Sequence, residues 1–276
     1  MADPCLVGIL VFVIPAFILI VPGSAEVSIC ILAVLGIVKT IKERRNPLAD
    51  LGNRFLTVIC WAFLLVAIIS VMTSEPSIVG FQRLGTSIHF LLAPLIGILF
   101  LTTPNILKRL VHGIKAGAIL AGINAVIEYW LLSQGRADGA VNAIIFGDLA
   151  LLLGFLAMVN FFKETPQEKF LSALALALGL TAALLSETRN TWGAAPILIL
   201  TLLFIWWKGG FISPRRLTAT LTIALLAAII FASTPVFQHR YSQMINELKT
   251  LENHSEITSV RERVVMWKAG LKTHLG

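Results

Sequence analysis

Residues 170–207 read FLSALALALGLTAALLSETRNTWGAAPILILTLLFIWW. Two apolar runs are joined by the short polar segment SETRNT, residues 186–191. Each run approaches the ~20 residues that an α-helix needs to cross a hydrocarbon core of ~30 Å. This stretch therefore predicts two membrane-spanning helices connected by a tight turn.

The whole chain has the same character. Of its 276 residues, 57% are hydrophobic and 13% are charged, and the mean hydropathy is +0.86. A soluble domain of this size needs a polar shell that this composition cannot supply. We therefore predict an all-α polytopic membrane protein. Nine spans are expected, near residues 6–22, 25–40, 55–73, 87–103, 110–132, 144–162, 170–186, 191–207 and 217–234.

The first two spans lie close together, so they form either a tight hairpin or a partly re-entrant pair. The N-terminus, MADPCLVGILVF, has no basic region before its apolar run. We therefore expect a retained first span rather than a cleaved signal peptide. Cys5, Cys30 and Cys60 fall in or beside apolar segments, and their spacing offers neither a metal motif nor an obvious disulfide.

Orientation follows from the basic residues. A cytoplasmic N-terminus places thirteen of them in the inside loops and the first turn of the fifth span, against three outside: Arg83, Arg136 and Arg189. This bias is the one expected for cytoplasmic loops, so the net charge of +7 reflects topology rather than nucleic-acid binding. The thirteen are Lys39, Lys42, Arg44, Arg45, Arg54, Lys108, Arg109, Lys115, Lys163, Lys169, Lys208, Arg215 and Arg216.

The same orientation divides the chain into a transmembrane bundle, residues 1–234, and an external segment, residues 235–276. Apolar residues recur at helical spacing in VFQHRYSQMINELKTL and again in SVRERVVMWKAGLKTHLG, with the turn-rich NHSEITS between them. We expect two amphipathic helices at the outer membrane boundary. Because the chain stops just after the second helix, we expect it to be a fragment of a longer protein.

Arg189 is the most informative outside arginine. The SETRNT turn is so short that its guanidinium must sit at the membrane edge, near Glu187, lipid headgroups or an anionic ligand. Arginine suits a phosphate because its planar fork binds two oxygens and keeps its charge. Thr191 or Asn190 could cap the next helix and expose N–H groups to the same anion. Pairing with Glu187 or with headgroups is the alternative interpretation.

Other polar residues near the outer face have two interpretations each. Arg136 lies in a glycine-bounded loop where Asp138 is a local ion partner, or it contacts substrate. Asp148 caps the sixth span or binds a sugar hydroxyl, and Glu128 accepts a proton or extends to the interface. Arg83 is expected to be structural. In the second external helix, Arg263 flanks the apolar stripe, whereas Arg261 is expected to be solvated. The five histidines form no triad or zinc pattern with neighbouring residues.

Three stretches together resemble the O-antigen ligase and polymerase family of bacterial envelope enzymes. GRADGAVNAIIFGDLALLLGFLAM, residues 135–158, is similar to the family's arginine-containing loop before a span. LLSETRNTWGAAPILIL, residues 184–200, is similar to its S-x-[ST]-R signature. HRYSQMINEL and SEITSVRERVVMWKAGLK resemble the opening of its large periplasmic loop. The resemblance covers roughly residues 130–276 and is nearest to the lipopolysaccharide O-antigen ligases.

This resemblance implies a GT-C-type membrane glycosyltransferase of ~12 spans, inverting and metal-independent, with no cofactor. It would transfer O-antigen polysaccharide from undecaprenyl diphosphate to lipid A–core at the periplasmic face of the inner membrane. Arg189 and Arg263 match the family's two essential arginines and would hold the diphosphate, with Arg136 and Asp148 as further candidates for substrate binding. The family's catalytic histidine lies later in the periplasmic loop, so the resemblance places the base beyond residue 276.

Three alternatives remain open at this point. An O-antigen polymerase or a protein O-oligosaccharyltransferase of the same superfamily would use the same donor with another acceptor. A secondary transporter would place charged or broken helices near the bilayer midplane and show an internal repeat, and no clear repeat is visible. A non-catalytic assembly protein would tolerate loss of both arginines.

Overall fold

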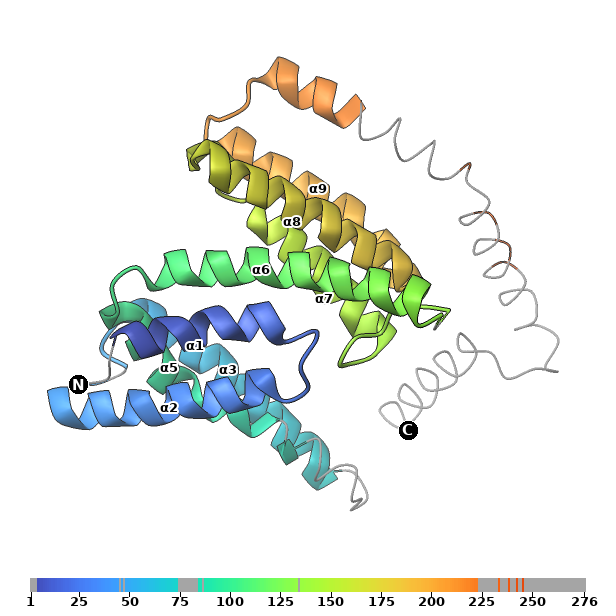
Figure 1. Cartoon of the computed structure of the whole chain (residues 1–276). Coiled ribbons are helices and arrows are strands. Elements are labelled where there is room, and N and C mark those ends of the chain that lie inside the picture. Colours follow the sequence, from blue (N-terminus) through green and yellow to red (C-terminus); the bar gives the residue numbers. More distant parts are fainter. Residues whose placement is uncertain are drawn as a thin grey trace, which may run out of the picture. The chain divides into compact units, whose positions relative to one another are not determined.

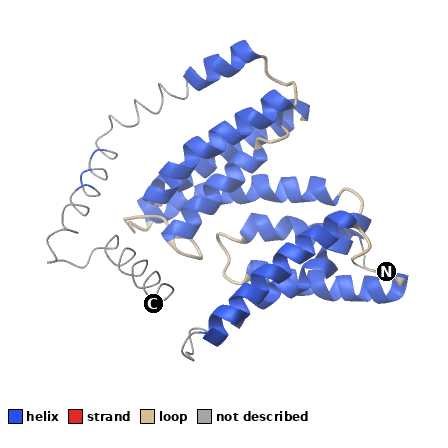
Figure 2. Ribbon diagram, turned by 180° about the vertical axis from the view of Figure 1, so that it is seen from behind, coloured by secondary structure: helices blue, strands red, loops and turns tan. Residues whose placement is uncertain are grey.

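The computed structural model describes residues 4–44, 46, 48–73, 84–85, 87–133 and 135–222, together with positions 233, 238, 242 and 245. All regular elements in these ranges are helical, and no strand occurs among them (Figure 2). The helices are α1 Pro4–Phe17, α2 Ser24–Glu43, α3 Leu51–Thr73, η1 Ile88–Leu92, α5 Ala93–Thr102, α6 Ile106–Val126, η2 Ile127–Leu131, α7 Ala143–Ala157, η3 Phe161–Lys163, α8 Pro166–Leu185 and α9 Arg189–Lys208.

Six helical stretches within the described residues are long and apolar enough to cross a membrane. They include α2, α3, α8, most of α9, α6 extended by η2, and α7 extended to Lys163. Two further apolar helical stretches are shorter, Pro4–Phe17 and Ile88–Thr102. The predicted fold class, an all-α polytopic membrane protein, is confirmed. The ninth predicted span, 217–234, falls largely outside the described residues.

The first predicted span is shorter in the structure than in the sequence analysis. We expected residues 6–22, but α1 ends at Phe17 and the chain turns through residues 18–23 before α2. Gly23 closes this turn with a φ of +74°, a conformation that only glycine adopts at little cost. α1 and α2 then pack against each other, as the tight-hairpin alternative expects.

The chain divides into two compact units after Ile205. Within the first unit, α6 is the central element, because it packs against α1, α7 and α8 (Figure 1). α7 is also central: 50% of its span is buried, whereas α3 buries only 11% and presents the rest outward. Apolar residues facing outward are expected where a helix contacts lipid.

Two apolar clusters hold this unit together. One joins α6, α7 and α8 through small side chains such as Ala118, Ala150, Ala175 and Ala182, all fully buried. The other packs α1, α2 and α5 through larger residues that include Val11, Leu32 and Leu99. In lipid there is no hydrophobic driving force between helices, so their association depends on close packing. Small residues allow the helix backbones to approach closely. The α6–α7–α8 core therefore provides a tightly packed support for the loops at its ends.

Candidate functional site

Four helix termini meet at one end of the α6–α7–α8 core. They are the C-terminal ends of α6 and α8 and the N-terminal ends of α7 and α9, connected by loop 132–142 and turn 186–188 (Figure 1). A backbone hydrogen bond from the Ala137 N–H to the Leu185 carbonyl, 2.9 Å long, joins the two connections. The structure thus brings the loop of Arg136 to the turn that precedes Arg189.

The carboxylate of Glu128 holds loop 132–142 in place through hydrogen bonds to its backbone. Glu128 lies in η2, a single turn of π-helix that continues α6. One carboxylate oxygen accepts the N–H groups of Asp138 and Gly139, both at 3.0 Å, and the other accepts Asn124 Nδ2 at 2.8 Å. π-turns often occur at functional positions. Only 9% of Glu128 is exposed, so the expectation that it extends to the interface is wrong: the loop covers it.

Gly139 allows the loop to lie this close to the core. Its φ is +58°, and a Cβ there would lie 2.5 Å from both the Leu19 carbonyl oxygen and the Phe146 ring. Leu19 also accepts a backbone hydrogen bond from Ala140 at 2.9 Å. The tight glycine loop expected from the sequence is therefore present, and it is tied to the segment after α1.

A chain of buried hydroxyl groups connects turn 186–188 to α7. We call Ser186, Thr188, Thr191 and Asp148 the hydroxyl network. Thr191 donates from Oγ1 to Asp148 Oδ1 at 2.7 Å and is also hydrogen-bonded to Thr188, which is 2.9 Å from Ser186 Oγ. Ser186 in turn donates to the Ala183 carbonyl at 2.8 Å. The three hydroxyl residues are at most 5% exposed.

The hydroxyl network fixes the first turn of α9 to the second turn of α7. Gly147 permits this contact, since a Cβ there would lie 2.8 Å from Thr188 Oγ1 and would overlap Ser186. Buried hydrogen-bonded networks of this kind rigidify the segments that they join. The backbone of Arg189, the first residue of α9, is therefore held between Thr188 and Thr191.

Two capping expectations are wrong. The residue that caps α7 is Asn142, whose side chain accepts the Ile145 N–H at 3.0 Å, rather than Asp148. Asp148 lies inside α7, where Thr191 occupies one of its carboxylate oxygens. Because α9 begins at Arg189, Thr191 lies in its first turn instead of preceding it. Asn and Thr both suit caps, and only the helix start decides between candidate positions.

The remaining predicted residues divide by location. Arg136 is exposed and, in the part of the chain that the structure describes, makes no ion pair with Asp138. The side chain of Arg189 lies outside what the structure describes, as do Arg83, Arg261, Arg263, and the external histidines His239, His254 and His274. The expected pairing of Arg189 with Arg263 stays a prediction.

Ser186 and Thr188 were not identified from the sequence as contact residues. The available signal was their spacing, because Ser186, Thr188 and Thr191 place three hydroxyl groups between two apolar runs. A hydroxyl group there needs a partner once it leaves water. The sequence does not show that the partner is Asp148, 43 residues away in the chain.

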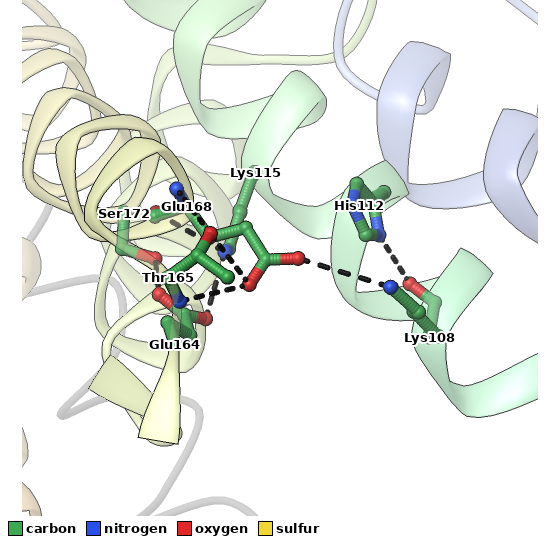
Figure 3. A network of polar contacts seen from close by, with 7 residues as sticks. All are labelled: Lys108, His112, Lys115, Glu164, Thr165, Glu168 and Ser172. Carbon is green, nitrogen blue, oxygen red and sulfur yellow. Dashed lines mark hydrogen bonds and ion pairs between the residues drawn. The ribbon is translucent and has the colours of Figure 1, made fainter. Parts of the chain in front are cut away.

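A second polar network lies toward the other ends of α6 and α8 (Figure 3). Lys115 Nζ lies 2.7 Å from Glu164 Oε1, and their side chains are 4% and 8% exposed. Ser172 donates to the second Glu164 oxygen at 2.6 Å. Lys115, expected in the first turn of the fifth span, lies further inside the helix because α6 begins at Ile106, and it is buried and paired with Glu164. Among the described residues, no group of three His, Cys, Asp or Glu side chains could hold a metal ion.

Part of the chain is similar to known proteins. Residues 174–274 match the profile of the O-antigen ligase family. The chain is 28% identical over 153 residues to an O-antigen ligase of Escherichia coli K12, an alignment that covers 54% of this chain and 34% of that protein. It is 20% identical over 261 residues to an uncharacterized protein of Haemophilus influenzae Rd, covering 92% of this chain and 64% of that protein.

The helices and their apolar surfaces define a multi-pass α-helical membrane protein. Residues 174–274 are similar to the O-antigen ligase family, and the Escherichia coli relative has the same description. The chain spans about a third of the length of the ligase relative and about two thirds of the other. The matched region contains both Arg189 and Arg263.

Proposed function

We propose that the protein is an O-antigen ligase, a glycosyltransferase that moves O-antigen polysaccharide from undecaprenyl diphosphate to lipid A–core. The observation that carries this proposal is the family match over residues 174–274, which includes the SETR turn and the SVRERVVMW segment. In this proposal Arg189 and Arg263 hold the diphosphate, and the N-terminus of the chain is cytoplasmic. The transfer takes place at the periplasmic face of the inner membrane. Residues 1–234 form the membrane bundle, and residues 235–276 begin the periplasmic loop.

The physical argument concerns the leaving group. When the glycosyl bond to the diphosphate breaks, negative charge develops on a phosphate oxygen, and donors positioned in advance stabilise it. Arginine supplies such donors with a permanent charge. The hydroxyl network supports this role, since it fixes the backbone on both sides of Arg189 to α7. A general base must still deprotonate the acceptor hydroxyl, and we propose no base within this chain.

In this proposal Asp148 and Thr191 support the site and do not contact the substrate themselves. Because Thr191 already occupies an oxygen of Asp148, we propose that both are positioning residues for the start of α9. Arg136 remains a candidate for substrate contact, since its loop is held beside the same turn and its side chain is exposed. The polar groups near the donor would then comprise Arg189, Arg263 and Arg136, with Asp148 beneath them.

The test is complementation of a strain from which the gene has been deleted. We expect deletion to abolish long-chain lipopolysaccharide while undecaprenyl-linked polymer accumulates. Arg189→Ala should lower transfer ~10²–10³-fold, the usual cost of removing one preorganised donor to a developing oxyanion. Arg189→Lys should recover part of it, since lysine keeps the charge without the planar fork. Normal ligation by both Arg189→Ala and Arg263→Ala at normal protein levels would contradict the proposal.

The same strain separates the related functions. A polymerase would leave lipopolysaccharide capped with single repeat units, and a protein O-oligosaccharyltransferase would leave lipopolysaccharide unchanged while glycoproteins disappear. A secondary transporter would take up substrate in proteoliposomes without glycan transfer. We favour the ligase because the family match and the named Escherichia coli relative agree on it.

The positioning role has its own test. Thr191→Val keeps the shape of the side chain but removes the hydroxyl that joins Asp148 to Thr188. We expect a roughly tenfold loss of transfer, because small displacements of a positioned group weaken its contact with the transition state. Thr191→Ser should restore activity, whereas a packing role for the Thr191 methyl group would make the serine variant as poor as the valine variant.

A further inference from the structure

A basic cavity lies where the beginning of α6 meets α1. Its volume is about 430 Å³, and its lining residues are Gly8, Ile9, Phe12, Asn105, Lys108, Arg109 and His112. Among the residues that the structure describes, the lining includes one lysine, one arginine and one histidine but no carboxylate. It lies at the opposite end of α6 from Glu128 and the hydroxyl network, so the proposed donor site does not use it.

Contacts with α1 hold Arg109 in this cavity. Its Nη1 donates to the Cys5 carbonyl at 3.5 Å, a long hydrogen bond. The side chain lies directly on the Gly8 backbone, because a Cβ at Gly8 would overlap the Arg109 Cδ and lie 2.5 Å from its Nε. The absence of a side chain at Gly8 thus lets the guanidinium lie against α1. One weak carbonyl contact leaves most of its five N–H donors for a ligand.

Lys108 and His112 complete the cationic lining. Lys108 Nζ is 3.9 Å from Glu168 Oε1, and the lysine side chain is 68% exposed, so this pair is weak (Figure 3). His112 Nδ1 lies 2.6 Å from the Lys108 carbonyl, which can only accept, so Nδ1 carries the proton. Asn105, which precedes α6, makes no side-chain cap. The cavity therefore combines positive charge with open N–H donors, and an anion with several oxygens matches that chemistry.

The opposite wall of the cavity is apolar. Ile9 and Phe12 come from α1, and Ile9 is 49% exposed. A soluble anion gains nothing from such a wall, whereas a lipid places acyl chains next to its phosphate. Basic pockets between transmembrane helices on the cytoplasmic side bind anionic headgroups for this reason. We propose that this cavity binds the phosphate of an anionic phospholipid such as phosphatidylglycerol, with the acyl chains along α1.

Native mass spectrometry of the delipidated full chain tests this site. We expect phosphatidylglycerol to remain bound more tightly than phosphatidylcholine of the same chain length. Each basic residue near a lipid headgroup typically changes affinity about fivefold, so Lys108→Gln/Arg109→Gln should weaken phosphatidylglycerol binding about 30-fold. Lys42→Gln is the matched control, because Lys42 is exposed in the last turn of α2 and does not line the cavity. It should leave binding unchanged.

The remaining comparisons decide between a lipid and a soluble phosphate. Displacement of the lipid by millimolar inorganic phosphate or glycerol 1-phosphate would overturn the lipid assignment, as would equal binding of phosphatidylcholine. If the double variant does not fold, Lys108→Gln alone should still weaken binding about fivefold, because its exposed side chain contributes little to packing. An unchanged affinity in that folded variant overturns the proposal.

Discussion

The buried ion pair between Lys115 and Glu164 is expected to contribute strongly to the stability of the protein. Both charges are almost completely buried, and their mutual contact, together with Ser172, replaces the water that each has lost. Removing one partner leaves the other charge unpaired in a medium of low polarity, which typically costs ~3–5 kcal/mol. The sequence located Lys115 near a membrane boundary but gave no indication of its partner 49 residues later.

We therefore predict that Lys115→Met lowers the stability of the detergent-purified protein by ~3 kcal/mol or more. Lys115→Met/Glu164→Met should recover most of this loss, since neither charge is then stranded. Lys108→Met is the control, because its ion pair with Glu168 is long and exposed to solvent and therefore contributes little to stability. Unfolding followed by intrinsic tryptophan fluorescence measures all three. Equal effects of Lys115→Met and Lys108→Met would show that burial of the pair is unimportant.

Glu128 is expected to stabilise loop 132–142 by accepting hydrogen bonds from its backbone amides. Removing its carboxylate deprives the Asp138 and Gly139 amides of their acceptor, and a hydrogen bond to a charged group is worth ~1.5–3 kcal/mol. Glu128→Ala should accelerate amide hydrogen exchange in the peptide that covers residues 135–142. Asn124→Ala removes one bond to Glu128 but leaves those two amides paired, so it should change exchange much less. Unaltered protection in Glu128→Ala would show that the Glu128 carboxylate does not hold residues 135–142 in place.

At the scale of elements, the apolar pattern predicted the order of the first eight helical segments; six of them are long and apolar enough to cross a membrane, whereas Pro4–Phe17 and Ile88–Thr102 are shorter. It did not predict where helices end, because termini depend on local contacts that hydropathy does not report. α1 ends early at the turn before Gly23, and α9 begins early at Arg189, next to the hydroxyl network. The close approach of α6, α7 and α8 also depends on which small residues face one another, and that is a property of the packed bundle.

Gly122 offers a test of that packing. A Cβ there would lie 2.5 Å from the Leu178 Cβ and 2.6 Å from its carbonyl oxygen. Gly122→Ala should force α6 from α8 and destabilise the protein by ~1–3 kcal/mol. Gly193→Ala meets nothing within 4 Å, so it should be neutral or slightly stabilising, since alanine is the better helix former. Thermal unfolding in one detergent compares them, and equal midpoints would contradict the close packing.

At the scale of the whole molecule, the membrane orientation stays a prediction from the positive-inside bias. Cysteine labelling tests it in a variant whose three native cysteines are replaced by serine. In spheroplasts, an impermeant maleimide should modify Val141→Cys, in the exposed loop before α7, without permeabilisation. Gln167→Cys, exposed in the first turn of α8, should react only after permeabilisation. The reverse pattern would invert the topology and remove the periplasmic site.

The sequence by itself determined the class of protein and the order of its helices, because long apolar segments have only one stable form in lipid: a helix that satisfies its own backbone. It also singled out Arg189 and Arg136, since charges at a membrane edge need an explanation. Only the tertiary structure decided the partners of the buried polar groups: Asp148 with Thr191, Glu128 with the 138–139 amides, and Lys115 with Glu164. Asp148 and Thr191 are 43 residues apart in the chain and Lys115 and Glu164 are 49 apart, so only the packed helices bring each pair within hydrogen-bonding distance.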